Sequence, residues 1–96
     1  MTYHLGLLTV DLYINTSPQS LKEKRMVIKP LKDKIRQTFN VSVSELDSQD
    51  KWQVATLGMV MIGPDHHYID SCLQNLLKLI EGYHPVDITH HQIEYR

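Results

Sequence analysis

The chain has 96 residues, the length of one small domain, and we expect residues 1–96 to form a single unit with a two-layer core and no large enclosed active site. The formal net charge is −1, yet residues 20–40 carry seven lysines and arginines against two acids, so this segment has a charge of +5 and the remainder −6. A single cysteine rules out an internal disulfide, and Asp11 within the N-terminal apolar run argues against a signal peptide or membrane span, so we expect a cytoplasmic protein without membrane contact.

The first predicted strand runs from Tyr3 to Ile14, because apolar side chains recur at every second position. One face carries Leu8, Val10, Leu12 and Ile14. The opposite face includes Leu5 and Leu7, so both faces are partly apolar. A turn at residues 15–18 ends the strand.

The first predicted helix begins at Leu21, where Ser20 and Glu23 form a capping box in which each side chain accepts a hydrogen bond from the other residue's backbone N–H. Its core face is a narrow arc that consists of Leu21, Ile28, Leu31, Ile35 and Phe39. Pro30 lies opposite this arc, so we expect a kink there and not the end of the helix.

Lys24 falls inside the apolar arc of this helix, where a lysine must extend its amine to solvent or pair with a carboxylate. We expect a structural ion pair in preference to a catalytic lysine. Asp11, Glu45 and Asp47 are the candidate partners.

After the helix, Val41 to Leu46 alternates as a half-buried strand, residues 47–51 form a polar turn, and Trp52 to Ile62 forms a third strand. Trp52 is expected to be a large buried anchor for the turn. The alternative is a recognition loop made of Asp47, Gln49, Asp50 and Trp52. The third strand is apolar on both faces and is therefore expected at the centre of the sheet.

The second predicted helix starts after Gly63, with Pro64 in its first turn, and Gly82 ends it. Its buried stripe consists of Ile69, Cys72, Leu73, Leu76, Leu79 and Ile80. In the last strand, Val86 to Tyr95, the apolar residues of the first half lie on one face and those of the second half on the other. A β-bulge is therefore expected near His90 and His91.

The predicted order β-α-β-β-α-β indicates an α+β protein with a ferredoxin-like fold. Such a fold is a two-layer sandwich, in which an antiparallel four-stranded sheet has its first and third strands at the centre and both helices on one face.

Two motifs carry a family resemblance. The head of the first helix reads Ser20-Leu21-Lys22-x-Lys24-Arg25, and the segment after it reads Phe39-Asn40-Val41-Ser42-Val43-x-Glu45-x-Asp47-x-Gln49-Asp50-x-Trp52-Gln53. Together they resemble the bacterial DUF503 family, also called YlxP-like. The resemblance implies a ferredoxin-like fold, no established catalytic activity, and a suspected link to RNA or the translation machinery. The chain departs from the family in a longer turn at residues 15–19, in Pro30, and in its histidine-rich C-terminal segment.

The first helix also presents a basic stripe, which consists of Lys22, Arg25, Lys29, Lys32 and Arg36. Spacings of three and four residues place these side chains in one row beside the core arc, over roughly 20 Å of helix. Such a row can neutralise the phosphates of a nucleic acid. It can equally be a solvated surface whose cations pair with the acidic remainder of the chain.

Catalytic and metal sites are not expected. The six histidines lack the spacing of a metal site, no phosphate-binding loop or nucleophile motif is present, and Cys72 belongs to a buried stripe. We therefore expect no cofactor, no metal and no enzymatic activity.

Two functions remain open. The first is a non-enzymatic, translation-associated module that binds RNA or the ribosome through the basic stripe. The alternative is a homo-oligomeric protein-interaction or small-ligand regulatory domain. The uncovered sheet face is expected to carry Leu5 and Leu7 beside one of two sets, either Val54, Val60 and Ile62 or Leu57, Met59 and Met61, and to be buried in a homodimer.

Overall fold

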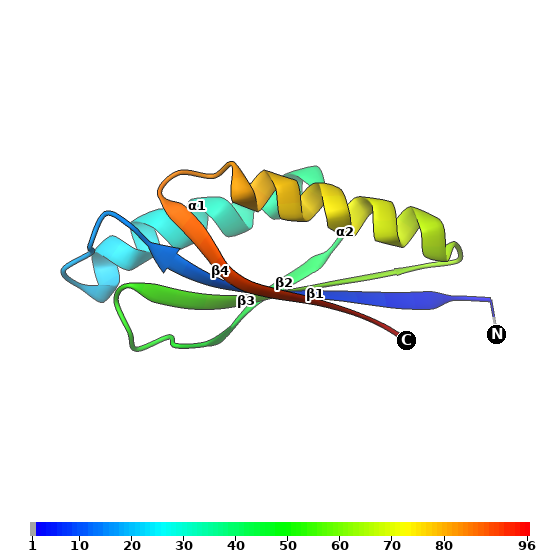
Figure 1. Ribbon diagram of the computed structural model, residues 1–96, viewed down its shortest axis with the longest axis horizontal. Coiled ribbons are helices and arrows are strands. Elements are labelled where there is room, and N and C mark those ends of the chain that lie inside the picture. The colour runs from blue at the N-terminus through cyan, green and yellow to red at the C-terminus, as the bar shows by residue number, and fades with distance from the viewer. Residues whose placement is uncertain (1) are drawn as a thin grey trace.

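The computed structural model describes residues 2–96, which form an α+β sandwich of one sheet and two helices (Figure 1). The elements are β1 (His4–Ile14), α1 (Leu21–Thr38), β2 (Ser42–Asp47), β3 (Val54–Gly63), α2 (His66–Glu81) and β4 (Val86–Tyr95). The antiparallel sheet has the order β2-β3-β1-β4, and both helices lie on one side of it. The ferredoxin-like fold predicted from the sequence is confirmed, with β1 and β3 at the centre.

The alternation of side chains along β1 and β3 assigns each residue to one face of the sheet. Toward the helices, the four apolar residues predicted for β1 are at most 1% exposed, and they pack beside Ala55, Leu57, Met59 and Met61 of β3. Val60 and Ile62 therefore lie on the open face, where they are 39% and 63% exposed. This outcome decides between the two sets left open by the sequence, because Leu57, Met59 and Met61 belong to the core.

The last strand contains the predicted bulge. Asp11 pairs with His90 but Leu12 pairs with Ile88, so Thr89 is the extra residue. A second bulge lies in β2, where Glu45 pairs with Leu57 but Asp47 pairs with Thr56. Each bulge changes the face to which the following side chains point.

The first helix begins at Leu21, as predicted, with Ser20 as its N-cap. The Ser20 Oγ accepts a hydrogen bond from the Glu23 backbone N–H at 3.1 Å, but the Glu23 carboxylate accepts from the N–H of Gln19 at 3.2 Å. The first bond of the capping box forms as predicted, whereas the donor of the second bond is Gln19 and not Ser20. The helix continues through Pro30 to Thr38, which agrees with the expectation that proline would not end it.

The second helix is capped by Asp65, whose side chain accepts a hydrogen bond from the backbone N–H of His67 at 3.0 Å. Pro64 precedes this cap, so its predicted position in the first turn is wrong. Gly82 ends the helix as expected. The buried residues are Ile69, Leu73, Leu76, Leu77 and Ile80. Cys72 and Leu79 lie at the border of this set and are partly buried.

Close packing joins α2 to the sheet. A Cβ atom at Gly6 would lie 2.5 Å from Cγ2 of Ile69, so β1 can approach the helix only with glycine at this position. At the same end of the sheet, the Tyr95 hydroxyl donates a hydrogen bond to Asp70. Burial and this bond raise the pKa of Tyr95 to about 12.

Candidate nucleic-acid interface

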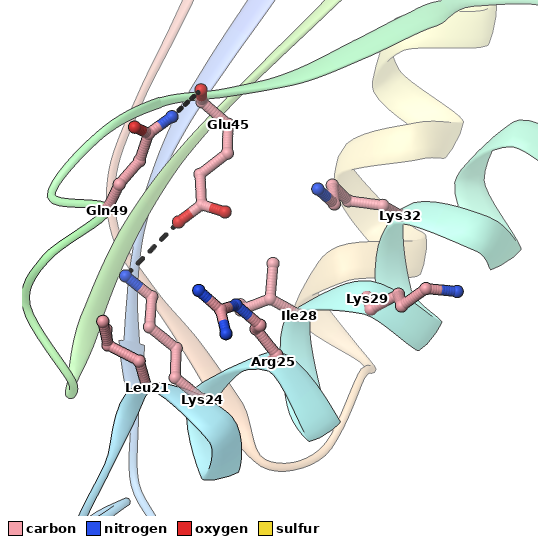
Figure 2. A pocket seen from close by; sticks show the side chains of 8 residues that line it. All are labelled: Leu21, Lys24, Arg25, Ile28, Lys29, Lys32, Glu45 and Gln49. Atoms are coloured by element: carbon pink, nitrogen blue, oxygen red, sulfur yellow. Dashed lines mark hydrogen bonds and ion pairs between the residues drawn. The ribbon is translucent and has the colours of Figure 1, made fainter.

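A groove separates α1 from β2 and the loop of residues 47–51, and Figure 2 shows the side chains that line it. Its volume is about 220 Å³. The lining residues are Leu21, Lys24, Arg25, Ile28, Lys29, Lys32, Glu45 and Gln49. The groove thus combines a cationic wall from α1, an apolar base from Leu21 and Ile28, and a polar wall from β2 and the loop.

Lys24 closes one end of the groove and is almost completely buried, with 2% of its surface exposed. Its Nζ donates hydrogen bonds to the carbonyl oxygens of Ser48 at 2.6 Å and Lys51 at 2.7 Å, and it forms an ion pair with Oε2 of Glu45 at 3.3 Å. The buried ammonium group thus has two hydrogen-bond acceptors and one carboxylate that balances its charge. The expected structural ion pair is confirmed, and its partner is Glu45.

The other two candidate partners point away from Lys24. Asp11 lies on the open face, where its Oδ1 accepts a hydrogen bond from Thr56 at 2.8 Å. Asp47 follows the bulge in β2, pairs with Thr56, and uses its Oδ1 to accept from the backbone N–H of Ser48 at 2.7 Å. The choice of Glu45 therefore follows from which carboxylate faces the helices.

The loop that Lys24 binds adopts a tight turn, as its polar sequence predicted. Ser48 has a φ of 62°, in the left-handed region, and its carbonyl oxygen also accepts from the backbone N–H of Lys51 at 3.1 Å. A left-handed conformation is unfavourable for a residue with a Cβ atom. The two bonds to the Ser48 carbonyl help to hold the loop in this conformation.

The basic stripe lies along one side of α1, with four of its five residues exposed and Lys32 partly buried. Lys29 and Arg36 form ion pairs with Asp33 of the same helix at 3.4 and 3.5 Å. Arg36 also donates to the carbonyl oxygen of Val43 at 3.3 Å. Within residues 2–96, Lys22, Arg25 and Lys32 form no ion pair, so the structure does not show these cations neutralised by the acidic remainder of the chain.

The side chains of the stripe differ in direction. The Arg25 guanidinium lies below the Glu45 carboxylate and the Lys32 nitrogen points toward it from the side, whereas Lys29 points away from the groove (Figure 2). Across the groove, Gln49 donates from Nε2 to the carbonyl oxygen of Glu45 at 3.0 Å. Two unpaired cations and one carboxylate thus face a common space.

Trp52 is not the buried anchor that the sequence predicted. It is 48% exposed and precedes β3, which begins at Val54. The four residues of the predicted recognition loop also do not form one site. Gln49 lines the groove beside α1, whereas Asp50 and Trp52 line a separate, shallow hollow with Lys51, Gln53 and Val54.

Replacement of Trp52 with alanine is expected to lower the free energy of unfolding by about 1 kcal/mol or less, because about half of the side chain is already in contact with solvent. Urea unfolding followed by circular dichroism measures this change. Leu57→Ala, at a position with no exposed surface, is the matched control and should cost about 3 kcal/mol. A similar loss for both variants would contradict this expectation.

His4, His66 and His67 lie together. His4 and His66 stack edge-to-face with ring centroids 5.8 Å apart, and His66 also contacts Tyr95 at 4.4 Å. In the part of the chain that the structure describes, no three His, Cys, Asp or Glu side chains are arranged to hold a metal ion. Neither of the helices between residues 2 and 96 is long and apolar enough to cross a membrane.

The open face of the sheet carries an apolar patch at one end, formed by Leu5, Leu7, Val60 and Ile62. Leu5 and Leu7 are partly buried, because neighbouring side chains of the sheet cover part of their surface. Glu94 and Arg96 lie beside the patch and form an ion pair at 3.4 Å. We refer to the four apolar residues, Leu5, Leu7, Val60 and Ile62, as the open-face patch.

The sequence named Glu45 as a candidate partner of Lys24, and Leu21 and Ile28 as part of the core arc, but it did not predict that they line a groove. Three residues of the basic stripe, Arg25, Lys29 and Lys32, form the opposite wall.

Comparisons with known proteins identify a family. A family model described as "Protein of unknown function (DUF503)" matches residues 5–93. The chain is 34% identical over 70 residues to "Uncharacterized protein YlxP" of Bacillus subtilis (strain 168), a match that covers 73% of this chain and 76% of that protein.

Two solved structures are also similar in outline. The de novo designed protein Foldit4 has a TM-score of 0.48 and 14% identity, with 96% of this chain and 93% of that chain covered. A putative PII-like signaling protein from Thermus thermophilus has a TM-score of 0.48 and 13% identity, with 100% and 90% covered. Likeness at this level carries no information about function.

Proposed function

The chain belongs to the DUF503 family of proteins of unknown function, and we propose that it is a non-enzymatic module that binds RNA, in the cytoplasm and on the ribosome, through the basic stripe of α1. The observation that carries the proposal is that three cations of the basic stripe form no ion pair with the described residues. Lys22, Arg25 and Lys32 have no acidic partner within residues 2–96. Unpaired cations in a row are free to neutralise the phosphates of a bound polynucleotide.

The shape of the molecule supports the same function. The stripe follows an 18-residue helix on the outer side of the sandwich, so a polynucleotide can lie along it without entering the core. The groove beside the stripe provides space for a base that turns away from the backbone of the polynucleotide. Thr9, Asp11 and Thr56 occupy the middle of the open sheet face, where sheet-face RNA-binding modules carry paired aromatic residues for base stacking, and the exposed Tyr13 lies only at the end of β1.

Salt dependence tests this proposal. Binding of a fluorescein-labelled single-stranded RNA should weaken as salt increases, with a slope of log K against log salt of about −3.5 if all five cations of the stripe contact phosphates. Fluorescence anisotropy measures the slope. The purified protein should also carry absorbance at 260 nm that a high-salt wash removes. The absence of binding at low salt would contradict the proposal.

A second candidate function concerns the open-face patch, which we propose to be covered by a second copy of this chain. Val60 and Ile62 are exposed apolar side chains next to Leu5 and Leu7. Glu94 and Arg96 at the edge of the patch carry opposite charges, so a two-fold axis through the patch can exchange their partners between copies. The patch is thus complementary to itself in both polarity and charge.

Ile62→Lys is expected to convert the dimer into a monomer, because it places a charge in the apolar contact while it leaves the core intact. Light scattering at micromolar concentration should report about twice the chain mass for the parent and one chain mass for the variant. Met26→Lys, at an exposed apolar position on α1, is the control and should remain dimeric. A monomeric parent would refute the dimer.

A further inference from the structure

The carboxylate that pairs with Lys24 also occupies the wall of the groove opposite the basic stripe. The Glu45 side chain is 20% exposed, and its Oε2 forms an ion pair with Nζ of Lys24 at 3.3 Å. The carboxylate faces the same space as the nitrogen atoms of Arg25 and Lys32 (Figure 2). A group that fills this space must present negative charge to α1 and hydrogen-bond donors to β2.

A nucleotide meets both requirements, since its phosphate is an anion and its base edge carries N–H donors. The four bases differ in how well they match a carboxylate. Guanine presents two adjacent donors, the N1–H and the N2 amino group, which can bond to the two oxygens together. Adenine and cytosine place a ring acceptor beside their amino group, and uracil places its N–H between two carbonyl groups, so each of these bases sets a lone pair against the carboxylate.

The dimensions and the base of the groove fit a single nucleobase. A volume of about 220 Å³ is below the range of roughly 300–1,000 Å³ that drug-sized ligands occupy, so the groove has no room for two bases. Leu21 and Ile28 supply an apolar surface for the ring.

We propose that the groove binds one unpaired guanine of an RNA strand. Glu45 accepts hydrogen bonds from N1 and N2 of the base, and Arg25 and Lys32 contact the flanking phosphates. Lys24 acts as a positioning residue, because it holds Glu45 and the loop of residues 47–51 in place. This inference rests on the proposed RNA-binding function and adds a base preference to it.

A series of short uridine oligomers with one central guanosine, inosine, adenosine or cytidine tests the inference on the unmodified protein. Fluorescence anisotropy at fixed salt should give about tenfold tighter binding for guanosine than for adenosine or cytidine. Inosine lacks the N2 amino group and should lie between them, about fivefold weaker than guanosine. Equal affinities for guanosine and adenosine would overturn the guanine site while RNA binding stands. No binding to any oligomer would overturn both.

Glu45→Gln provides an independent test, because an amide replaces one acceptor oxygen with a donor that opposes guanine. The variant should bind the guanosine and adenosine oligomers equally. Glu81→Gln, at an exposed carboxylate at the C-terminal end of α2, is the control and should keep the preference. A full guanosine preference in a folded Glu45→Gln variant would overturn the inference. If that variant does not fold, the inosine comparison decides.

Discussion

Replacement of both Arg25 and Lys32 with glutamate is expected to lower the affinity for RNA by about a hundredfold at physiological salt, because two phosphate contacts become two repulsions. Both side chains point into the groove and have no acidic partner within residues 2–96. The loss should also appear in cells as reduced cosedimentation with ribosomes. Anisotropy titration and sucrose-gradient centrifugation measure the two effects.

The control for this variant carries the same change in net charge at another place. Lys34 lies on the far side of α1 and Lys78 lies on α2, and both are exposed. Their replacement with glutamate should reduce affinity by about threefold or less, through the general field alone. Because new acids near Glu45 can weaken the fold, Arg25→Gln with Lys32→Gln serves as a neutral version. Equal losses in the groove variant and in the control would contradict binding at the stripe.

Lys24→Ala is expected to lower the free energy of unfolding by about 3 kcal/mol or more, since it leaves a partly buried carboxylate and two carbonyl oxygens without their donor. Removal of one partner from a buried charge pair is among the most destabilising single changes. Urea unfolding measures the loss. Hydrogen exchange should show that the backbone amides of residues 47–51 lose protection in the folded variant.

Two further variants separate the causes of this effect. Lys24→Met keeps most of the aliphatic packing and removes the three donors, so its loss measures the polar contacts. Lys34→Ala, at an exposed position of the same helix, should change stability by about 0.5 kcal/mol or less. A loss below about 1 kcal/mol for Lys24→Ala would show that the loop does not depend on this lysine.

The strands, the helix ends and the order of the sheet could be predicted because local patterns determine them. Period-two alternation assigned the residues of β1 to their faces, and Ser20 and Gly82 marked one end of each helix. The bulge at Thr89 was also predictable, since the apolar residues of β4 change parity. The Glu23 bond was misplaced by one residue and Pro64 by two, which is the usual uncertainty of helix ends.

Two features depended on geometry that the sequence does not contain. Trp52 was assigned to the core on its size, but β3 begins two residues later, and Trp52 is 48% exposed. The partner of Lys24 depended on the bulge in β2, because without it Asp47 would face the helices as Glu45 does. The spacing of the basic residues predicted that they form a row along α1. The groove beside this row could not be predicted, because it depends on the position of β2 relative to α1.

The position of β1 between β3 and β4 has a consequence for how the protein folds during synthesis. One edge of β1 bonds to residues 86–95, which are made long after residues 6–14. Until then a chain with both helices complete still exposes a long, apolar strand edge with unpaired backbone groups, which is a template for association with other chains. Closure of the sheet is thus a non-local and late event, so chains interrupted before Val86 should be the ones that aggregate.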